Sequence, residues 1–309
     1  MSITAVEVQD LKKHYGATRA VDGVSFTVGA GEVFGMLGPN GAGKTTTTEI
    51  IEGLRTADAG QVRVLGLDVR REAQQVKSRI GVQLQTTALY PRLTVREVLD
   101  LFATFFPGAK RSTDTLIDMV NLREKEKTQT RNLSGGQRQR LSVALALINK
   151  PEIVFLDEPT IGLDPQARRS MWETIRHIQS SGATVFLTTH YMEEAQVLCD
   201  RVAVVDAGKI IALDSPNALI SQHFRETAIE FDVAGELPPE GTFRGLKAVS
   251  RPAVREGQHI TIYSDDATLT LGGLTDLAEA GTVKFDDLHV RRATLEDVFL
   301  KLTGKHIRE

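Results

Sequence analysis

The sequence predicts an α/β domain over residues 1–223 and a small α+β domain over residues 224–309. Three observations lead to this prediction. A glycine-rich loop, Gly38 to Thr45, lies between a strand-like apolar run and a helix-like run. A second apolar run, Ile153 to Leu156, ends in two carboxylates, and parallel α/β sheets bind ligands at that end of their strands. Beyond the first domain, the pattern becomes alternating strands without a catalytic constellation.

The composition limits the classes of function. At 309 residues, the chain exceeds the usual single-domain size, which favours one large domain and a smaller one. Its formal net charge of −3 provides no general attraction for nucleic acid or anionic lipid, so we expect no nucleic-acid partner. The single cysteine, Cys199, cannot form an internal disulfide, which favours a reducing compartment. No leader and no run long enough to span a bilayer is seen, so a membrane role would require a partner.

The glycine-rich loop has the spacing of a phosphate loop: Gly, four residues, Gly, Lys and Thr. Its glycines let the backbone wrap around phosphates, and the helix N–H groups point at them. Lys44 adds a cation for the β- and γ-phosphates, and Thr45 offers a hydroxyl to Mg²⁺. A plain glycine-rich turn is the alternative. The residues expected to bind nucleotide here are Gly38, Pro39, Asn40, Gly41, Ala42, Gly43, Lys44, Thr45 and Thr46.

The N-terminal segment reads as two half-buried strands, Thr4–Gln9 and Val24–Val28. We expect residues 11–20 to connect them. Tyr15 is the aromatic residue in that connection. An exposed ring beside a nucleotide site can stack on adenine, and a tyrosine that packs within its loop is the alternative.

Two further strands are expected at Gln61–Leu65 and Arg79–Leu84, with Gln85 directly after the second. The pattern then becomes helical over Leu93–Phe106 and Ser112–Leu122. These segments predict a compact helical insertion, followed by the polar stretch Arg123 to Lys127, which is most simply a solvated face.

A second helix start with exposed glycines follows at Ser134, the expected N-cap of a helix that continues to Ile148. The buried strand Ile153–Pro159 comes next and carries Asp157 and Glu158 at its carboxyl end. The turn that contains Asp164 starts an amphipathic helix to about residue 180. His190 follows directly after the expected strand Thr184–Thr189. The expected hairpin Val202–Leu213 is the last part of the large sheet domain, and a short helix, Pro216–Gln222, comes after it.

The C-terminal residues predict three strands and two helices. The strands are Ala228–Val233, Ile260–Tyr263 and Thr282–Phe285, and the helices are Leu271–Ala280 and Leu295–Leu302. No candidate site residue lies in this domain.

In this order and spacing, the phosphate loop, Gln85, the Leu133-Ser-Gly-Gly-Gln137 motif, Leu156–Pro159, Asp164 and His190 resemble the ATP-binding cassette (ABC) family over about residues 3–222. The Ser-Gly-Gly-Gln motif is specific, since other phosphate-loop kinases and GTPases lack it. The resemblance implies a P-loop NTPase ABC ATPase domain with an antiparallel β subdomain and a helical subdomain, which binds ATP and Mg²⁺.

The resemblance also implies a role for each site residue. Asp157 would hold Mg²⁺ with Thr45, and Glu158 would be the general base. His190 would contact the γ-phosphate, and Gln85 would sense Mg²⁺ and signal to the partner. The remaining nucleotide-binding residues would be Ser134, Gly135, Gly136, Gln137 and Asp164.

The family likeness further implies that Ser134 and Gly136 face the phosphate loop of a second subunit. Two chains would then pair head to tail around two ATP molecules in a symmetric homodimer. Two positions depart from the family pattern: Ile161 replaces a frequent small hydroxyl residue, and Leu145 replaces a frequent arginine. Neither touches the expected chemistry.

The closing motif, Ala293–Gly304, resembles the drug- and antibiotic-resistance exporter branch, whose permease is a separate polypeptide. It implies an ATPase that powers export of a drug, antibiotic or other small lipophilic molecule from the inner face of the cell membrane. One alternative is a soluble cassette ATPase that acts on nucleic acid or ribosomes, although the chain has one cassette and no heptad run. A regulatory ATPase is the other alternative.

Overall fold

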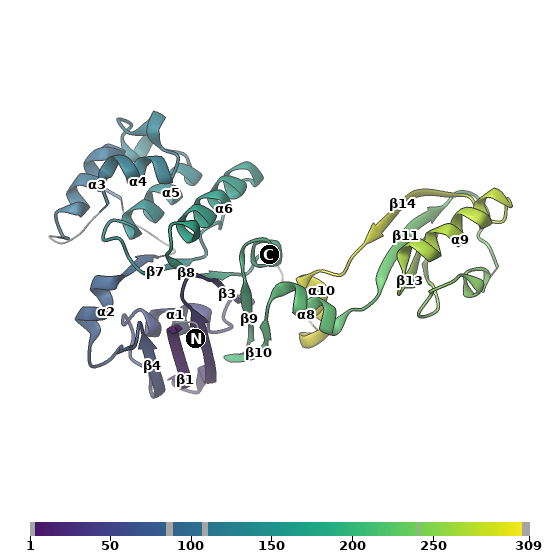
Figure 1. The fold of residues 1–309 in the computed structure, drawn as a ribbon, viewed down its shortest axis with the longest axis horizontal. Coiled ribbons are helices and arrows are strands. Elements are labelled where there is room, and N and C mark those ends of the chain that lie inside the picture. Colours follow the sequence, from purple (N-terminus) through teal and green to yellow (C-terminus); the bar gives the residue numbers. More distant parts are fainter. Residues whose placement is uncertain (1–3, 85–88, 107–110, 240, 305–309) are drawn as a thin grey trace. The chain divides into compact units, whose positions relative to one another are not determined.

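The computed structural model describes residues 4–84, 89–106, 111–239 and 241–304 (Figure 1). The chain divides into two compact units, and the division falls between Pro216 and Asn217 in the sequence. The boundary expected after residue 223 lies close to this division and stays a prediction. Each unit has its own buried core.

The first unit is built around a six-stranded sheet with the strand order β10-β9-β3-β8-β7-β6. Its strands are β3 (Val33–Leu37), β6 (Ile80–Gln83), β7 (Ile153–Asp157), β8 (Thr184–Thr189), β9 (Arg201–Asp206) and β10 (Lys209–Asp214). All neighbouring pairs are parallel except β9 and β10. Every residue of β3, β7 and β8 is buried, as is typical of parallel strands covered on both faces. The carboxyl ends of these three strands therefore lie side by side.

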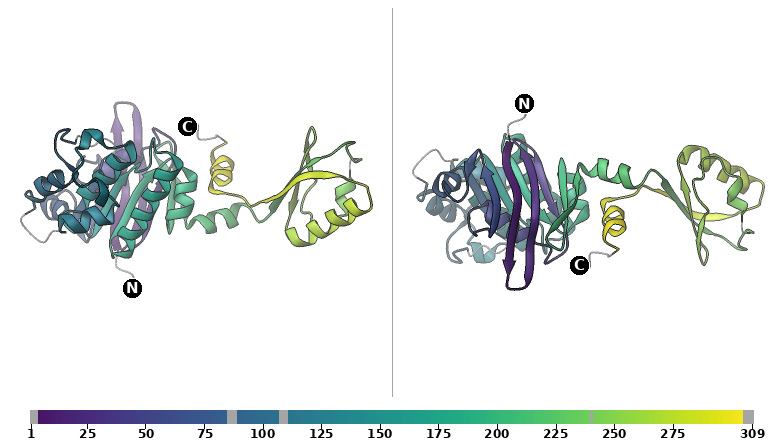
Figure 2. Two further views of the ribbon diagram at one scale, coloured as in Figure 1. Left: turned by 90° about the horizontal axis from the view of Figure 1, so that it is seen from above. Right: turned by 90° about the horizontal axis from the view of Figure 1, so that it is seen from below.

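An antiparallel sheet with the order β2-β1-β4-β5 lies in the same unit. Its strands are β1 (Thr4–Tyr15), β2 (Thr18–Gly29), β4 (Ala59–Val64) and β5 (Leu67–Asp68). Figure 2 shows β1 and β2 as a long purple hairpin. The expectation that residues 11–20 form a connection was wrong, because strand pairing continues to Tyr15 and Thr18. Register shifts after Val8 and Lys13 interrupt the alternation by which a sequence reveals a strand.

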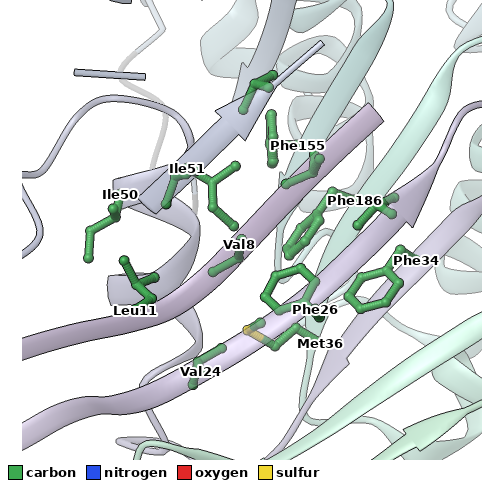
Figure 3. Close-up of a cluster of buried hydrophobic side chains, with 14 of the residues drawn as sticks. Val8, Leu11, Val24, Phe26, Phe34, Met36, Ile50, Ile51, Phe155 and Phe186 are labelled. Atoms are coloured by element: carbon green, nitrogen blue, oxygen red, sulfur yellow. The ribbon is translucent and has the colours of Figure 1, made fainter. Parts of the chain in front are cut away.

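A cluster of aromatic rings joins the two sheets (Figure 3). Phe26 of β2 stacks on Phe34 of β3 with ring centroids 5.1 Å apart. Phe186 of β8 lies 5.4 Å from Phe34 and 5.4 Å from Phe155 of β7. Such pairs contribute about 0.5–1.5 kcal/mol each beyond the burial of their area. They fix the strands that carry the candidate site.

The first unit also contains the helices α1 (Lys44–Ile51), α2 (Ala73–Arg79), α3 (Val95–Ala103), α4 (Thr113–Met119), α5 (Gly135–Ala146), α6 (Pro165–Ser180) and α7 (Met192–Leu198). Of these, α3 and α4 correspond to the helical insertion expected over Leu93–Phe106 and Ser112–Leu122. Helix α2 was not expected, because only Val76 of its seven residues is buried and no periodic apolar pattern results.

The polar stretch after α4 is exposed, as expected, but it is also ordered by ion pairs. Arg123 lies 2.7 Å from Asp114 and 2.6 Å from Asp118. Arg96 of α3 lies 2.8 Å from Asp114 and 2.6 Å from Glu126. Because these charges form a network, they tie α3 to α4 more firmly than isolated surface pairs would.

The second unit holds an antiparallel sheet with the order β12-β13-β11-β14. Its elements are α8 (Pro216–His223), β11 (Thr227–Val233), η3 (Thr242–Gly245), β12 (Val254–Glu256), β13 (His259–Ser264), α9 (Ala267–Glu279), β14 (Phe285–Arg291) and α10 (Leu295–Thr303). The strand expected at Thr282–Phe285 was misplaced. Strand β14 begins where that prediction ended, and its mostly exposed residues show no alternation. It lies at the edge of the sheet, where one face need not be apolar.

Truncation after residue 223 should leave the first unit folded and its ATP affinity unchanged. All residues of its aromatic core precede that position, and the second core starts at Ile229. Circular dichroism with calorimetric ATP titration tests this expectation. A monodisperse truncated chain that no longer binds ATP would contradict it.

Candidate active site

The phosphate loop connects the end of β3 to the start of α1. Gly43 has a φ of 100°, and a Cβ there would lie 2.2 Å from the carbonyl oxygen of Ala20. A Cβ on Gly38 would lie 2.2 Å from the carbonyl oxygen of Val205. Glycine is therefore required at both ends of the loop, because any side chain would collide with backbone.

The first turn of α1 is left open to a ligand. Its N-cap, Gly43, supplies no side-chain acceptor, so the initial N–H groups remain available to an anion. The threonines that make a poor helix start are accommodated by back-bonding. Thr47 donates its hydroxyl to the carbonyl of Gly43 at 2.9 Å, and Thr48 donates to that of Lys44 at 3.0 Å.

Lys44 is buried, with only 4% of its surface exposed. Its Nζ donates to the carbonyls of Gly38 at 2.8 Å and Pro39 at 3.2 Å. It also lies 3.4 Å from Glu158 Oε1. Burial lowers the pKa of Lys44, and the neighbouring Glu158 opposes that shift. The loop thus holds a desolvated cation directly beside a carboxylate.

Glu158 is held in a strained conformation at the end of β7. Its φ is 46°, which is uncommon for a residue with a side chain, and it is 6% exposed. Its backbone N–H donates to the hydroxyl and the carbonyl of Thr188, at 3.1 and 3.2 Å. Its Oε2 lies 3.2 Å from His190 Nδ1 at the end of β8. Among the described residues, these two atoms form no hydrogen bond, so each retains capacity for a ligand.

Asp157 precedes Glu158 and is also buried. The hydroxyl of Thr188 donates to its Oδ1. Burial raises the pKa of Asp157, and the hydrogen bond from Thr188 opposes that shift. One residue of β8 therefore supports both acids, through its side chain for Asp157 and through its backbone and hydroxyl for Glu158.

A buried carboxylate behind the site, Glu194 of α7, was not singled out from the sequence. Its Oε1 accepts the indole N–H of Trp172 at 3.1 Å. Burial raises the pKa of Glu194, while the nearby side chains of Thr189, Thr160 and Trp172 oppose the shift. Thr189 precedes His190, and Thr160 follows Glu158 by two positions, so Glu194 lies beside both chain segments. The sequence offered adjacent glutamates, Glu193 and Glu194, and only the direction of α7 shows which one is inside.

Glu52, directly after α1, was also missed. It is 2% exposed, and burial with the nearby charges of Asp157 and Glu49 raises its pKa to about 8. Because the folded state keeps this proton, stability should be highest below the ordinary pKa of 4.5 and fall as pH rises through about 8.

Glu52→Gln should therefore stabilise the protein at about pH 9, by on the order of 3–5 kcal/mol, and change little at about pH 5. Urea unfolding at both pH values measures the difference. Glu124→Gln, which makes the same change at an exposed position, is the matched control. Equal effects of Glu52→Gln at the two pH values would show that Glu52 is not protonated in the folded state.

The Ser-Gly-Gly-Gln motif and Asp164 begin neighbouring helices. Ser134 caps α5: its Oγ accepts from the Gln137 N–H at 3.3 Å, and its own N–H donates to the Gln137 side chain at 3.0 Å. Asp164 caps α6 by accepting the Ala167 N–H at 2.8 Å. A Cβ on Gly136 would lie 2.9 Å from that of Ala167, so the helix starts are in contact. Within the described residues, no hydrogen bond or ion pair joins either one to the phosphate loop.

Tyr15 ends β1 with 42% of its surface exposed. Lys13 Nζ and the Arg55 guanidinium lie 5.6 and 5.4 Å from its ring centroid. Its stacking on adenine stays a prediction. Gln85 lies outside the described residues.

A phosphate loop and two buried acids at the carboxyl edge of a parallel sheet, with an antiparallel sheet and a helical insertion around them, define an ATP-binding cassette. Structural comparison agrees. The dimeric structure of an ATP-binding cassette in a post-hydrolysis state, bound to ADP and Pi, matches 68% of this chain and 98% of its own, at 26% identity and a TM-score of 0.62. A cassette in its ADP conformation matches 69% of this chain and 91% of its own, at 25% identity and a TM-score of 0.62.

Sequence comparison gives the family. The family model described as "ABC transporter" matches residues 21–161. Nod factor export ATP-binding protein I of Ralstonia nicotianae is 39% identical over 100% of this chain and 96% of its own length. Linearmycin resistance ATP-binding protein LnrL of Bacillus subtilis is 36% identical over 98% of this chain and 100% of its own. The chain belongs to the ABC transporter family as an ATP-binding protein, and it is an ATPase.

No helix in the described part of the chain is both long enough and apolar enough to cross a membrane.

Proposed function

We propose that this ATPase powers export of a small lipophilic molecule through a separate membrane permease. The observation that carries the catalytic part is the position of Glu158, whose carboxylate lies between Lys44 and His190 at the edge of the sheet. The names of two relatives support export as the direction of transport, since one concerns Nod factor export and the other linearmycin resistance. The proposal places the chain at the inner face of the cell membrane, held there by the permease.

In this proposal, Glu158 accepts a proton from the attacking water or orients it, and His190 contacts the γ-phosphate. Lys44 and the first-turn N–H groups of α1 hold the β- and γ-phosphates. Gln85 senses the metal and transmits its state to the permease. These roles fit the buried Glu158 and the half-buried His190, whose Oε2 and Nδ1 atoms lie 3.2 Å apart and form no hydrogen bond among the described residues.

Asp157 and Thr45 would hold Mg²⁺. In phosphate-transfer sites, this ion is bound by one or two protein groups together with phosphates and water, so a large carboxylate cluster is unnecessary. A buried carboxylate at the end of β7 and a hydroxyl in the first turn of α1 fit that pattern. The ion would neutralise charge on the transferred phosphate.

The catalytic unit in this proposal is a head-to-tail homodimer. Ser134 and Gly135 are exposed at the start of α5 and would meet the phosphate loop of the second copy, sandwiching ATP. Gln137, Gly136 and Asp164 would shape the same contact, because their helices begin side by side. The dimeric form of the similar cassette supports this arrangement.

Ser134→Arg should prevent ATP-dependent pairing, because it places a bulky cation in the joint. The effect is measured in a Glu158→Gln background, where slow hydrolysis lets the ATP-bound dimer accumulate. Size-exclusion chromatography with light scattering, with Mg-ATP present, reports the mass. Ser180→Arg, at the exposed end of α6, is the matched control and should still pair. A Ser134→Arg protein that pairs as well as the control would contradict the shared site.

The export proposal is tested by fractionation of cells that produce the chain at native level. We expect it in the membrane fraction, released by detergent together with a polytopic membrane protein. Co-sedimentation with ribosomes, or retention on nucleic acid, would instead favour the ribosome- or nucleic-acid-acting alternative. A soluble chain with no membrane association would favour a regulatory ATPase.

A further inference from the structure

A cavity of about 430 Å³ lies within the second unit, outside every residue placed in the ATP site. It is bordered by η3, by β12 and β13 and by the segment that connects η3 to β12. Its apolar lining includes Phe243 and Ile260, both buried in the core of this unit, and the half-buried Val249. The volume is within the range of small-molecule sites, so one compact ligand would fit.

Three arginines also line the cavity: Arg244, Arg251 and Arg255. No carboxylate is present among the described residues that line it. Like charges around one apolar hollow repel each other unless an anion lies between them. The cavity therefore combines an apolar surface with an excess of positive charge.

The three guanidinium groups differ in what holds them. Arg251 lies over the Tyr263 ring, 3.4 Å from its centroid, and 3.0 Å from Glu226, which offsets its charge. Arg255 donates to the carbonyl of Pro238 at 2.7 Å, which orients the group but leaves its charge uncompensated. Within the described part of the chain, the Arg244 side chain has no hydrogen bond or ion pair, although its backbone N–H donates to the Gly241 carbonyl at 2.9 Å. Among the described residues, Arg251 is thus charge-paired, Arg255 is oriented by a neutral carbonyl, and the guanidinium of Arg244 has no partner.

We propose that this cavity binds a small anionic amphiphile, in which an apolar body lies against the half-buried Val249 and Ala253 and a single carboxylate or phosphate pairs with Arg244 and Arg255. Guanidinium groups form paired, charge-assisted hydrogen bonds with such anions. The apolar body adds affinity in proportion to the area that it buries. The site goes beyond the proposed transport function and does not depend on it, because ATP binds in the other unit.

Calorimetric titration of the full chain with octyl phosphate tests the proposal. Saturating Mg-ADP is present throughout, so that the probe cannot occupy the phosphate loop. Octyl phosphate should bind at least about tenfold more tightly than inorganic phosphate, which lacks the apolar body, and than octanol, which lacks the charge. Absence of octyl phosphate binding would overturn the proposal, and so would octanol or phosphate binding of equal strength.

Arg244→Gln should weaken octyl phosphate binding by at least about tenfold, because it removes the available guanidinium. Arg292→Gln is the matched control: it removes the same charge from an exposed arginine of the same unit outside the cavity, and should bind as the parent does. Neither variant should change ATP hydrolysis. If both substitutions weakened octyl phosphate binding equally, the effect would come from the net charge of the protein and not from the cavity. That result would overturn the assignment of the cavity.

Discussion

Glu158→Gln should lower ATP hydrolysis by roughly 10²- to 10⁴-fold, the usual range for loss of a general base, while ATP binding survives. The amide keeps the size of the side chain but cannot accept the proton of the attacking water. Binding should persist or tighten, because the substitution removes a negative charge 3.4 Å from the Lys44 cation and close to the expected γ-phosphate position.

Phosphate release under single-turnover conditions measures the chemical step, and calorimetry measures ATP affinity. Glu173→Gln, an exposed carboxylate of α6, is the control and should hydrolyse ATP at the parent rate. Parent-like hydrolysis by the Glu158→Gln protein would remove Glu158 from the catalytic role and leave the strained backbone at this position without a functional reason.

Lys44→Ala should weaken ATP binding by at least about 100-fold, since charge-assisted hydrogen bonds contribute about 1.5–3 kcal/mol each. Lys44 is the buried cation of the phosphate loop, and its ammonium group is held in place by two loop carbonyls. Its removal also leaves Glu158 beside the phosphates without a balancing charge.

Affinity measured by calorimetry decides this prediction. Lys77→Ala, on the exposed side of α2, removes an equal charge away from the loop and should bind ATP normally. Circular dichroism establishes that the Lys44→Ala protein is folded. Unchanged affinity in the folded variant would show that the loop does not bind the phosphates of ATP.

These two substitutions separate binding from chemistry. One removes the cation that holds the phosphates, and the other removes the carboxylate that acts on water. A site in which both groups served only to stabilise the fold would instead lose stability in each variant and show no divergence between affinity and hydrolysis rate.

The local motifs of this chain could be predicted from the sequence, because their structure depends on residues that are adjacent in the sequence. Gly38 to Thr45 specifies a strand-to-helix turn, and Ser134 with Gln137 specifies a helix start that the structure confirms as a capping box. Strands β7 and β8 were predicted well, since continuous apolar runs are typical of a sheet covered on both faces.

Elements that depend on pairing rather than burial were predicted poorly. The β1–β2 hairpin extends through residues 11–15. Register shifts there allow the strands to stay paired where apolar and polar residues no longer alternate in the sequence. Strand β14 was misplaced for a similar reason, as an edge strand needs no apolar pattern to pair with β11.

The sequence by itself determined the class of protein, because the Ser-Gly-Gly-Gln motif, which other phosphate-loop kinases and GTPases lack, accompanies a phosphate loop, two acids at the end of one buried strand and a histidine after another. Only the tertiary structure decided how these groups act on one another. The parallel strands β3, β7 and β8 bring Glu158 within 3.4 Å of Lys44 Nζ and within 3.2 Å of His190 Nδ1. More than a hundred positions in the sequence separate Lys44 from the other two residues. The buried state of Glu52 and Glu194 also depends on the fold, because the pKa of a carboxyl group is set by the atoms that surround it and not by its sequence neighbours.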